Sequence, residues 1–174
     1  MQHLQKIISA VGKFMERDSC LLKLGGHEQA ITHRIAVYLE AGFQGCRKIT
    51  VDCEYNKHLD TSKRGNFSYA DFEVEKEKYG ICGCEACSNS ASELNLHEKL
   101  FRPDILVRSR GNDDANLIAV EIKTNIVCAF DVTKLRALTR LKVNGGEYGY
   151  RLGLFLCFPN LQPKYEWIFP SATN

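Results

Sequence analysis

Residues 102–124 constrain the fold of this chain more than any other stretch of its sequence. Two apolar runs, 105–107 and 117–122, stand on either side of a polar turn that contains glycine. Asp104 opens the first run, while Glu121 interrupts the second and Lys123 follows it. Because burying an unpaired carboxylate is costly, acids inside apolar runs indicate a site rather than ordinary core. A hairpin of two buried strands would bring these three charged residues to one end of a sheet.

The spacing of the charged residues predicts a site for a divalent cation. Side chains alternate along a strand, so Glu121 and Lys123 share one face. Asp104, Glu121 and the backbone carbonyl of Ile122 offer the oxygen ligands that Mg²⁺ or Mn²⁺ prefers. A metal bound there acidifies a water molecule and holds a phosphate, and the ammonium of Lys123 stabilises the negative charge that develops. The alternative is a surface hairpin whose acids form an ordinary ion pair.

A helix earlier in the chain contributes another acid. The spacing of apolar residues predicts a helix over 27–41, with Ile31 and Ile35 on its inward face and Gly42 at its end. Glu28 lies on the same face, one turn from the start. It could be a solvated first-turn acid that the helix dipole favours. We favour a side chain that points into the site, where it holds a second metal or orients water.

The remaining elements predict one α/β domain over residues 1–174. The expected helix over 132–144 has Asp131 as its N-cap and turns Lys134, Arg136, Arg140 and Lys142 outward. In chain order, the predicted elements are a helix over 2–17, a helix over 27–41, a strand over 47–56, strands over 103–109 and 116–123, the helix over 132–144, a strand over 151–158 and an edge strand over 165–169.

Residues 57–98 lack a regular apolar pattern and are too long for an idle loop in a compact domain. Three cysteines, Cys82, Cys84 and Cys87, fall within six residues of this segment. Thiolates at that spacing can wrap one tetrahedral zinc ion, which would order the segment. We therefore predict a zinc-held insertion, with three incidental free thiols as the alternative.

A closed zinc site requires a fourth ligand. Cys53, His58 and His97 are the candidates, and we favour Cys53 because its ligand type matches the other three. Cys128 and Cys157 lie in apolar surroundings and are expected to be small buried hydrophobic residues.

Composition and the amino terminus bear on where the protein works. No stretch is apolar for long enough to cross a bilayer, and the first 20 residues mix charged and apolar residues unlike a signal peptide. We therefore expect a cytoplasmic protein whose eight cysteines do not form a disulfide scaffold. The formal net charge of +2 does not by itself require a nucleic-acid partner.

Pro103-Asp104 followed by Glu121-Ile122-Lys123 resembles the signature of the PD-(D/E)XK nuclease superfamily. Glu28 resembles the acid on that superfamily's first helix, and residues 51–56 and 150–155 resemble small stand-alone members found in bacteria and phages. The resemblance covers about 26–56 and 102–158 and leaves the segment 57–98 outside it. It implies a restriction-endonuclease-like fold, a mixed central sheet flanked by helices. It also implies that Glu28, Asp104, Glu121 and Lys123 are catalytic.

The function implied by the resemblance is that of a Mg²⁺-dependent endonuclease that hydrolyses phosphodiester bonds of DNA, ahead of RNA. The alternative is a non-catalytic nucleic-acid-binding or regulatory protein on the same fold. A homodimer or a subunit of a larger complex would fit as well, with the helix over 2–17 or the cysteine segment as the docking element.

Overall fold

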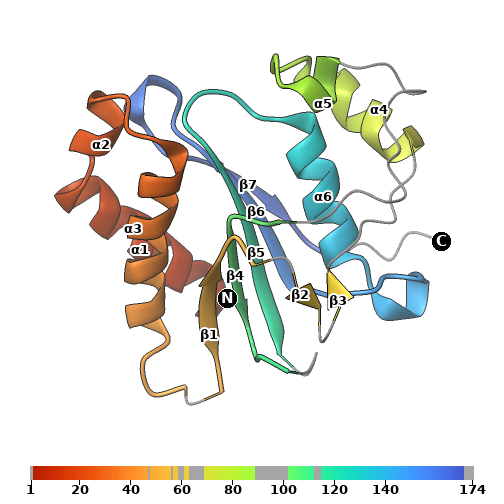
Figure 1. Ribbon diagram of the computed structural model, residues 1–174, viewed down its shortest axis with the longest axis horizontal. Helices are drawn as coiled ribbons and strands as arrows, with labels where there is room; N and C mark the ends of the chain where they lie inside the picture. The colour runs from red at the N-terminus through yellow and green to blue at the C-terminus, as the bar shows by residue number, and fades with distance from the viewer. Residues whose placement is uncertain are drawn as a thin grey trace.

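The computed structural model describes residues 2–46, 48–55, 57–58, 61–62, 69–88, 102–111 and 115–170. Within these ranges, five strands form one mixed sheet in the order β1-β4-β5-β6-β7, and two short strands form a separate pair (Figure 1). None of the helices described is long and apolar enough to span a bilayer. The elements are α1 (Gln2–Arg17), α2 (Cys20–Lys23), α3 (Glu28–Gly42), β1 (Thr50–Cys53), β2 (Lys57–His58), β3 (Thr61–Ser62), α4 (Tyr69–Tyr79), α5 (Glu85–Ser88), β4 (Ile105–Arg108), β5 (Asn116–Lys123), α6 (Ala129–Thr139), the 3-10 helix η2 (Lys142–Asn144), β6 (Leu152–Cys157), the 3-10 helix η3 (Pro159–Leu161) and β7 (Lys164–Ile168).

The centre of the sheet is the antiparallel pair of β4 and β5, in which Ile105 lies opposite Val120 and Leu106 opposite Ala119. β1 pairs antiparallel with the other edge of β4, β6 lies parallel to β5, and β7 pairs antiparallel with β6. Parallel neighbours need a crossover connection, and α6 supplies it between β5 and β6. The predicted mixed central sheet flanked by helices is therefore confirmed.

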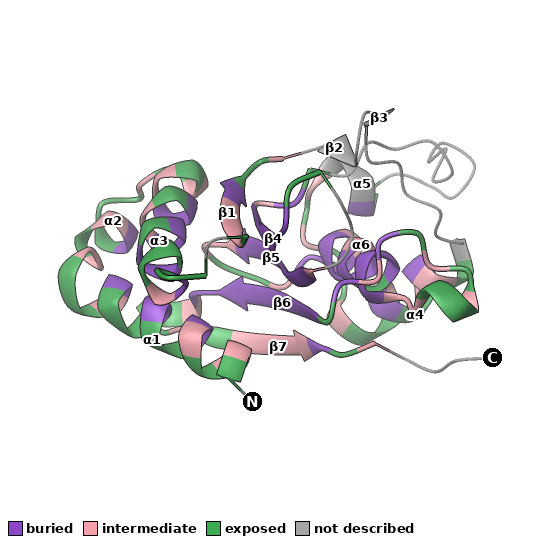
Figure 2. Cartoon of the chain, turned by 90° about the horizontal axis from the view of Figure 1, so that it is seen from below, coloured by how far each residue is buried: buried purple, intermediate pink, exposed green. Residues whose placement is uncertain are grey.

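Helices cover both faces of this sheet. On one face, α1 and α3 bury Phe14 and Ile31 in the same apolar cluster as Val120 of β5. On the other face, α6 buries Leu135 in a cluster with Phe155 of β6. Because both faces are covered, the first seven residues of β5 are all buried (Figure 2). An acid on β5 therefore has to find its partners inside the protein.

The helix after β5 differs from its predicted bounds. α6 begins at Ala129, three residues before the predicted start, and its N-cap is Cys128. Asp131 is therefore a first-turn residue, and the prediction that it is the N-cap is wrong. The helix ends at Thr139 because Arg140 adopts extended dihedral angles (φ −55°, ψ 132°), and η2 then covers part of the remaining predicted range.

Lys134 was expected on the outer face of this helix, and that prediction is wrong. Only 12% of its side chain is exposed. Lys134 precedes the fully buried Leu138 by four residues, so the two side chains lie on one face of α6. Arg136 is exposed, as predicted.

The segment 57–98, which has no apolar periodicity, nevertheless contains helices in its described part. α4 packs along α6, where the rings of Phe72 and Phe130 meet edge to face with centroids 6.2 Å apart. Glu75, three residues after Phe72, is also buried and pairs with Arg136. Because Glu75 is charged, it interrupts the apolar periodicity by which this helix would be predicted from the sequence. That the whole segment is an insertion within a single domain stays a prediction.

Close packing of α6 on β6 can be tested at Gly153. A Cβ there would lie 3.2 Å from both Ile168 Cβ and Thr139 Cγ2 and 3.4 Å from Leu135 Cβ. We expect Gly153→Val to lower the free energy of unfolding by about 1–3 kcal/mol in urea denaturation, because the added atoms overpack this contact. As a control, Gly12→Ala on the exposed side of α1, where a Cβ meets nothing within 4 Å, should raise it by about 0.5–1 kcal/mol. Equal effects of the two variants would contradict the packing described here.

Candidate functional site

Asp104 stands immediately before β4 and is tied to the neighbouring strand. Its Oδ2 accepts a hydrogen bond of 2.6 Å from the backbone N–H of Ile122. This bond fixes the carboxylate beside β5, next to the predicted residues Glu121 and Lys123. Burial raises the pKa of Asp104 from 3.8 to about 6, although the hydrogen bond from Ile122 and the charge of Lys123 act to lower it. The neighbouring groups therefore do not fully offset the cost of burying the charged form of Asp104.

Glu121 is buried between β5 and α6, with 2% of its surface exposed. Its Oε1 lies 2.9 Å from the Nζ of Lys134 on α6. Burial raises the pKa of Glu121 well above the ordinary value, and the charge of Lys134 only partly opposes this. The negative charges of Asp131 and Asp104 act in the same direction as burial. Asp104 lies near Glu121, because it is hydrogen-bonded to Ile122, the residue that follows Glu121.

Lys123 points to the same end of the sheet and meets Glu28 from α3. Its Nζ donates to Glu28 Oε2 at 3.0 Å, and the backbone N–H of Thr124 donates to Glu28 Oε1 at 3.4 Å. The four residues predicted to be catalytic therefore come from three elements and meet at one end of the β4–β5 pair. Burial acts to lower the pKa of Lys123, but the carboxylates of Asp131 and Glu28 raise it overall. The surrounding carboxylates thus favour the protonated form of this lysine.

Two further charged residues belong to this site and were missed in the sequence. Asp131 is buried in the first turn of α6 and lies 2.6 Å from Lys134 and 3.7 Å from Lys123. Lys134 in turn contacts Glu121, so that two residues of α6 contact both Glu121 and Lys123 of β5. The available signal was position: Asp131, Lys134 and Leu138 follow the i, i+3, i+7 spacing of one helix face. We call the six residues the acid–lysine cluster: Glu28, Asp104, Glu121, Lys123, Asp131 and Lys134.

The carboxylates of this cluster are the type of ligand that a hard divalent cation prefers. Its four carboxylates face two lysines, so the fully ionised cluster has an excess of two negative charges. Mg²⁺ is commonly held by one or two carboxylates while it keeps several water molecules. Asp104 and Glu121 provide two carboxylates at the same end of the β4–β5 pair. An ion bound by Glu121 would have to share Oε1 with Lys134 or move the lysine aside.

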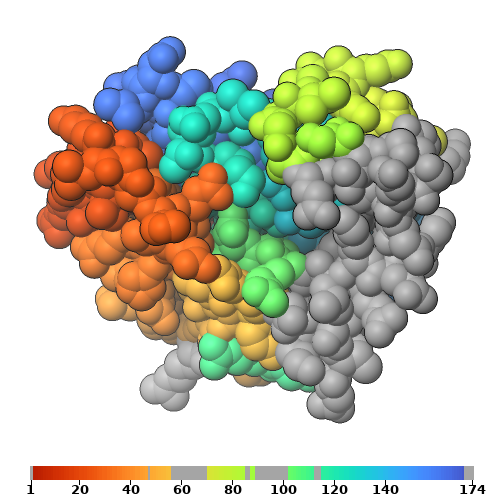
Figure 3. All heavy atoms as spheres, turned by 45° about the horizontal axis from the view of Figure 1, so that its top comes forward, coloured from red at the N-terminus to blue at the C-terminus, as the bar shows by residue number. Residues whose placement is uncertain are grey.

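A pocket of about 270 Å³ borders the acid–lysine cluster. Glu28 and Lys123 line one part of it, and the connection from β5 to α6 lines another. In the space-filling view, the surface is hollowed between the orange start of α3, the turquoise β5–α6 connection and the yellow-green α4–α5 segment (Figure 3). The rest of its lining consists of cysteines, namely Cys82, Cys84 and Cys128.

These cysteines are part of a four-residue thiol cluster. The cluster consists of Cys82, Cys84, Cys87 and Cys128, whose sulfur atoms all lie within 4.8 Å of one another. The Sγ of Cys128 is 3.7 Å from that of Cys84 and 3.8 Å from that of Cys87. Four tetrahedral thiolates at a Zn–S distance of about 2.3 Å have neighbouring sulfurs about 3.8 Å apart. The thiol cluster could therefore hold a single metal ion such as zinc.

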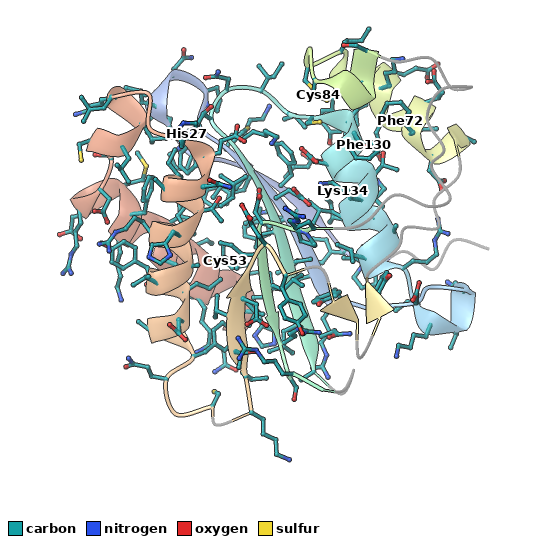
Figure 4. The ribbon with its side chains drawn as sticks, viewed as in Figure 1. His27, Cys53, Phe72, Cys84, Phe130 and Lys134 are labelled. Atoms are coloured by element: carbon teal, nitrogen blue, oxygen red, sulfur yellow. The ribbon has the colours of Figure 1, made fainter. Side chains whose placement is uncertain are left out.

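The fourth thiol is Cys128, and the choice of Cys53 as fourth ligand is wrong. Cys53 ends β1, where its thiol pKa is raised by burial and by the nearby carboxylates of Glu54 and Asp104. Figure 4 shows Cys53 well away from Cys84, which lies beside Phe130 at the start of α6. Cys128 is buried as predicted, but beside three thiols rather than as a simple hydrophobic residue. The side chain of His58 and all of His97 lie outside the described residues.

Protonation links metal binding in the thiol cluster to pH. Burial raises the pKa of Cys87 to about 11 and raises that of Cys128 further. Both thiols are therefore neutral at pH 7 without an ion. Because a metal binds thiolates, its binding has to release these protons and should weaken as the pH falls.

Comparison with known proteins gives no relative of this chain. No protein-family model matches the chain, and neither a curated protein nor a solved structure matches it.

The raised pKa of Asp104 predicts how stability depends on pH when no magnesium is present. Between pH 3.8 and about 6, an unfolded chain ionises Asp104 while the folded protein keeps the proton, so folding loses stability as the pH rises. The loss is at most about 3 kcal/mol. Asp104→Asn does not titrate, so its stability relative to wild type should rise by up to that amount from pH 4 to pH 7. Urea denaturation of both proteins in magnesium-free buffers measures the difference. A difference that stays constant with pH would contradict the pKa shift.

The identity of the fourth thiol predicts the metal content of two single variants. Protein purified under reducing conditions should contain about one zinc per chain, and Cys128→Ser should lose it because three thiolates leave the site open. Cys53→Ser is the matched control and should retain the metal. Elemental analysis by mass spectrometry gives both values and distinguishes zinc from iron. If Cys53→Ser loses the metal and Cys128→Ser keeps it, Cys53 is the fourth ligand, as the sequence predicted.

Proposed function

We propose that this chain is a Mg²⁺-dependent nuclease with a restriction-endonuclease-like fold and a PD-(D/E)XK site. The observation that carries the proposal is the meeting of Glu28, Asp104, Glu121 and Lys123 at one end of the β4–β5 pair. The order of elements also supports it: an acid-bearing helix precedes the hairpin, and a crossover helix leads from it to a parallel strand. We propose DNA as the substrate ahead of RNA, on the resemblance alone.

Asp104, Glu121 and the carbonyl of Ile122 are the groups that would hold magnesium. When bound, Mg²⁺ supplies an acidified water molecule and neutralises charge on the scissile phosphate. The hydrogen bond from Ile122 orients the carboxylate of Asp104, and Lys134 pairs with the carboxylate of Glu121.

Lys123 contributes fixed positive charge rather than a proton acceptor. Its pKa is raised by Asp131 and Glu28 despite burial, so it remains protonated throughout the range in which enzymes work. Glu28 and Asp131 hold the ammonium from two sides. A cation fixed in this way stabilises the negative charge that develops on the phosphate oxygens during hydrolysis, because it needs no reorganisation at that moment.

Cleavage is expected to depend on magnesium and on both signature residues of β5. With Mg²⁺ or Mn²⁺, the wild-type protein should cut at least one of single-stranded DNA, duplex DNA, branched DNA and RNA. Glu121→Gln removes a ligand and Lys123→Met removes the fixed charge, so each should lower the cleavage rate by about 10²–10³-fold or more. Circular dichroism and thermal melting establish whether both variants are folded.

Exposed residues of α1 offer matched controls for these substitutions. Glu16→Gln and Lys13→Met make the same chemical changes at exposed positions of α1 outside the acid–lysine cluster, and should cleave at the wild-type rate. Equal cleavage by all five proteins would place the activity elsewhere or in a contaminant. Binding without cleavage, with log affinity falling linearly against log salt concentration, would favour the alternative of a non-catalytic nucleic-acid-binding protein.

A further inference from the structure

Cys128 belongs to the thiol cluster and also begins the helix that completes the acid–lysine cluster. It is the N-cap of α6, and Asp131 follows it by three residues. Asp131 contacts both lysines of the site, Lys123 and Lys134. Less than one helical turn therefore separates a thiol of one cluster from the carboxylate that joins the lysines of the other.

The connection that leads from β5 to α6 is short and is held at both ends. At its start, the N–H of Thr124 donates to Glu28, the residue that also binds Lys123. At its end, the Sγ of Cys128 lies 3.7 Å from that of Cys84. The pocket of about 270 Å³ lies along this connection and touches both clusters. A change at the thiol cluster can therefore reach the acids through only five residues, 124–128.

We propose that a zinc ion in the thiol cluster fixes the first turn of α6 and thereby positions Asp131 in the acid–lysine cluster. The inference rests on the proposed function, because it treats that cluster as the magnesium site. Without the ion, the described side chains of residues 82–87 that meet the thiol of Cys128 are themselves thiols, which form weak hydrogen bonds. With the ion, two metal–sulfur bonds in series join the start of α6 to this segment.

Asp131 acts as a positioning residue in this scheme. It touches Lys123 and Lys134, and Lys134 touches Glu121, so the carboxylate controls where both cations lie relative to a bound ion. A displaced first turn would withdraw the carboxylate of Asp131, so that the charges of Lys123 and Lys134 would no longer be offset and would repel a divalent ion. The expected result is weaker binding of the divalent ion. Loss of an outer partner of a metal ligand typically costs about 10–100-fold in metal affinity.

The test compares zinc-loaded and zinc-free protein by two measurements that do not require catalysis. Zinc is removed by Cys84→Ser, which leaves α6 itself unchanged, and independently by chelation of wild type followed by exchange into chelator-free buffer. Hydrogen–deuterium exchange should then show lost protection over 124–139 and unchanged protection over α1. Mn²⁺ affinity, measured by electron paramagnetic resonance, should fall about tenfold or more. Cys53→Ser, which keeps the thiol cluster intact, should match wild type in both measurements.

Asp131→Asn distinguishes positioning from general stabilisation. This variant should keep its zinc, and its Mn²⁺ affinity should no longer depend on whether zinc is present. The proposal is overturned if zinc-free protein keeps both its protection over 124–139 and its Mn²⁺ affinity, or if protection is lost equally over α1. If no cleavage is found but zinc removal still lowers protection over 124–139, the nuclease proposal is rejected and the effect of zinc on α6 is supported. If cleavage and Mn²⁺ binding both survive zinc removal, only the proposed effect of zinc is rejected.

Discussion

The ion pair between Glu121 and Lys134 is the interaction on which the arrangement of this protein depends. Glu121 lies on a central strand covered on both faces, where an isolated carboxylate would cost several kcal/mol. Its counter-ion comes from α6, and Asp131 on the same helix holds that counter-ion in place. The position of α6 on the sheet is thus an electrostatic requirement as well as a result of apolar packing. A helix shifted by one residue would turn Lys134 about 100° away from Glu121.

Three kinds of contact hold α6 in that position, and two of them come from the segment 57–98. Leu135 packs on the sheet side with Phe155, and Gly153 allows the close approach. On the outer side, α4 contributes the ring of Phe72 and the buried acid Glu75. The thiol cluster meets the first turn at Cys128. A segment that resembles an addition to the fold is therefore in contact with the helix that completes the site.

Sequence patterns were sufficient for the five strands of the central sheet and for four of the six charged residues of the site, but not for the short strands β2 and β3. Alternation and apolar runs located β5 at its observed bounds, and the acids within those runs marked Asp104 and Glu121. The position of Lys134 was not predicted, because a charged residue on a helix is ordinarily expected on the exposed face. Its spacing from Leu138 nevertheless places it on the inner face. The place of Cys128 in the thiol cluster was not predicted for a different reason. A buried thiol among apolar neighbours has the same local sequence whether it packs as a hydrophobic residue or meets three cysteines more than 40 positions away.

The cost of the buried charges bears on why they are present. A buried ion pair is often no more stabilising than apolar residues of similar volume, so stability alone does not account for Glu121 and Lys134. Burial raises the pKa of Asp104 to about 6 and that of Glu121 well above its ordinary value, and for both acids the neighbouring carboxylate of Asp131 acts in the same direction. Acids perturbed in this way are concentrated at functional sites. A divalent cation would balance the two excess negative charges, and this balance connects the energetics of the fold to the metal-dependent chemistry that we propose.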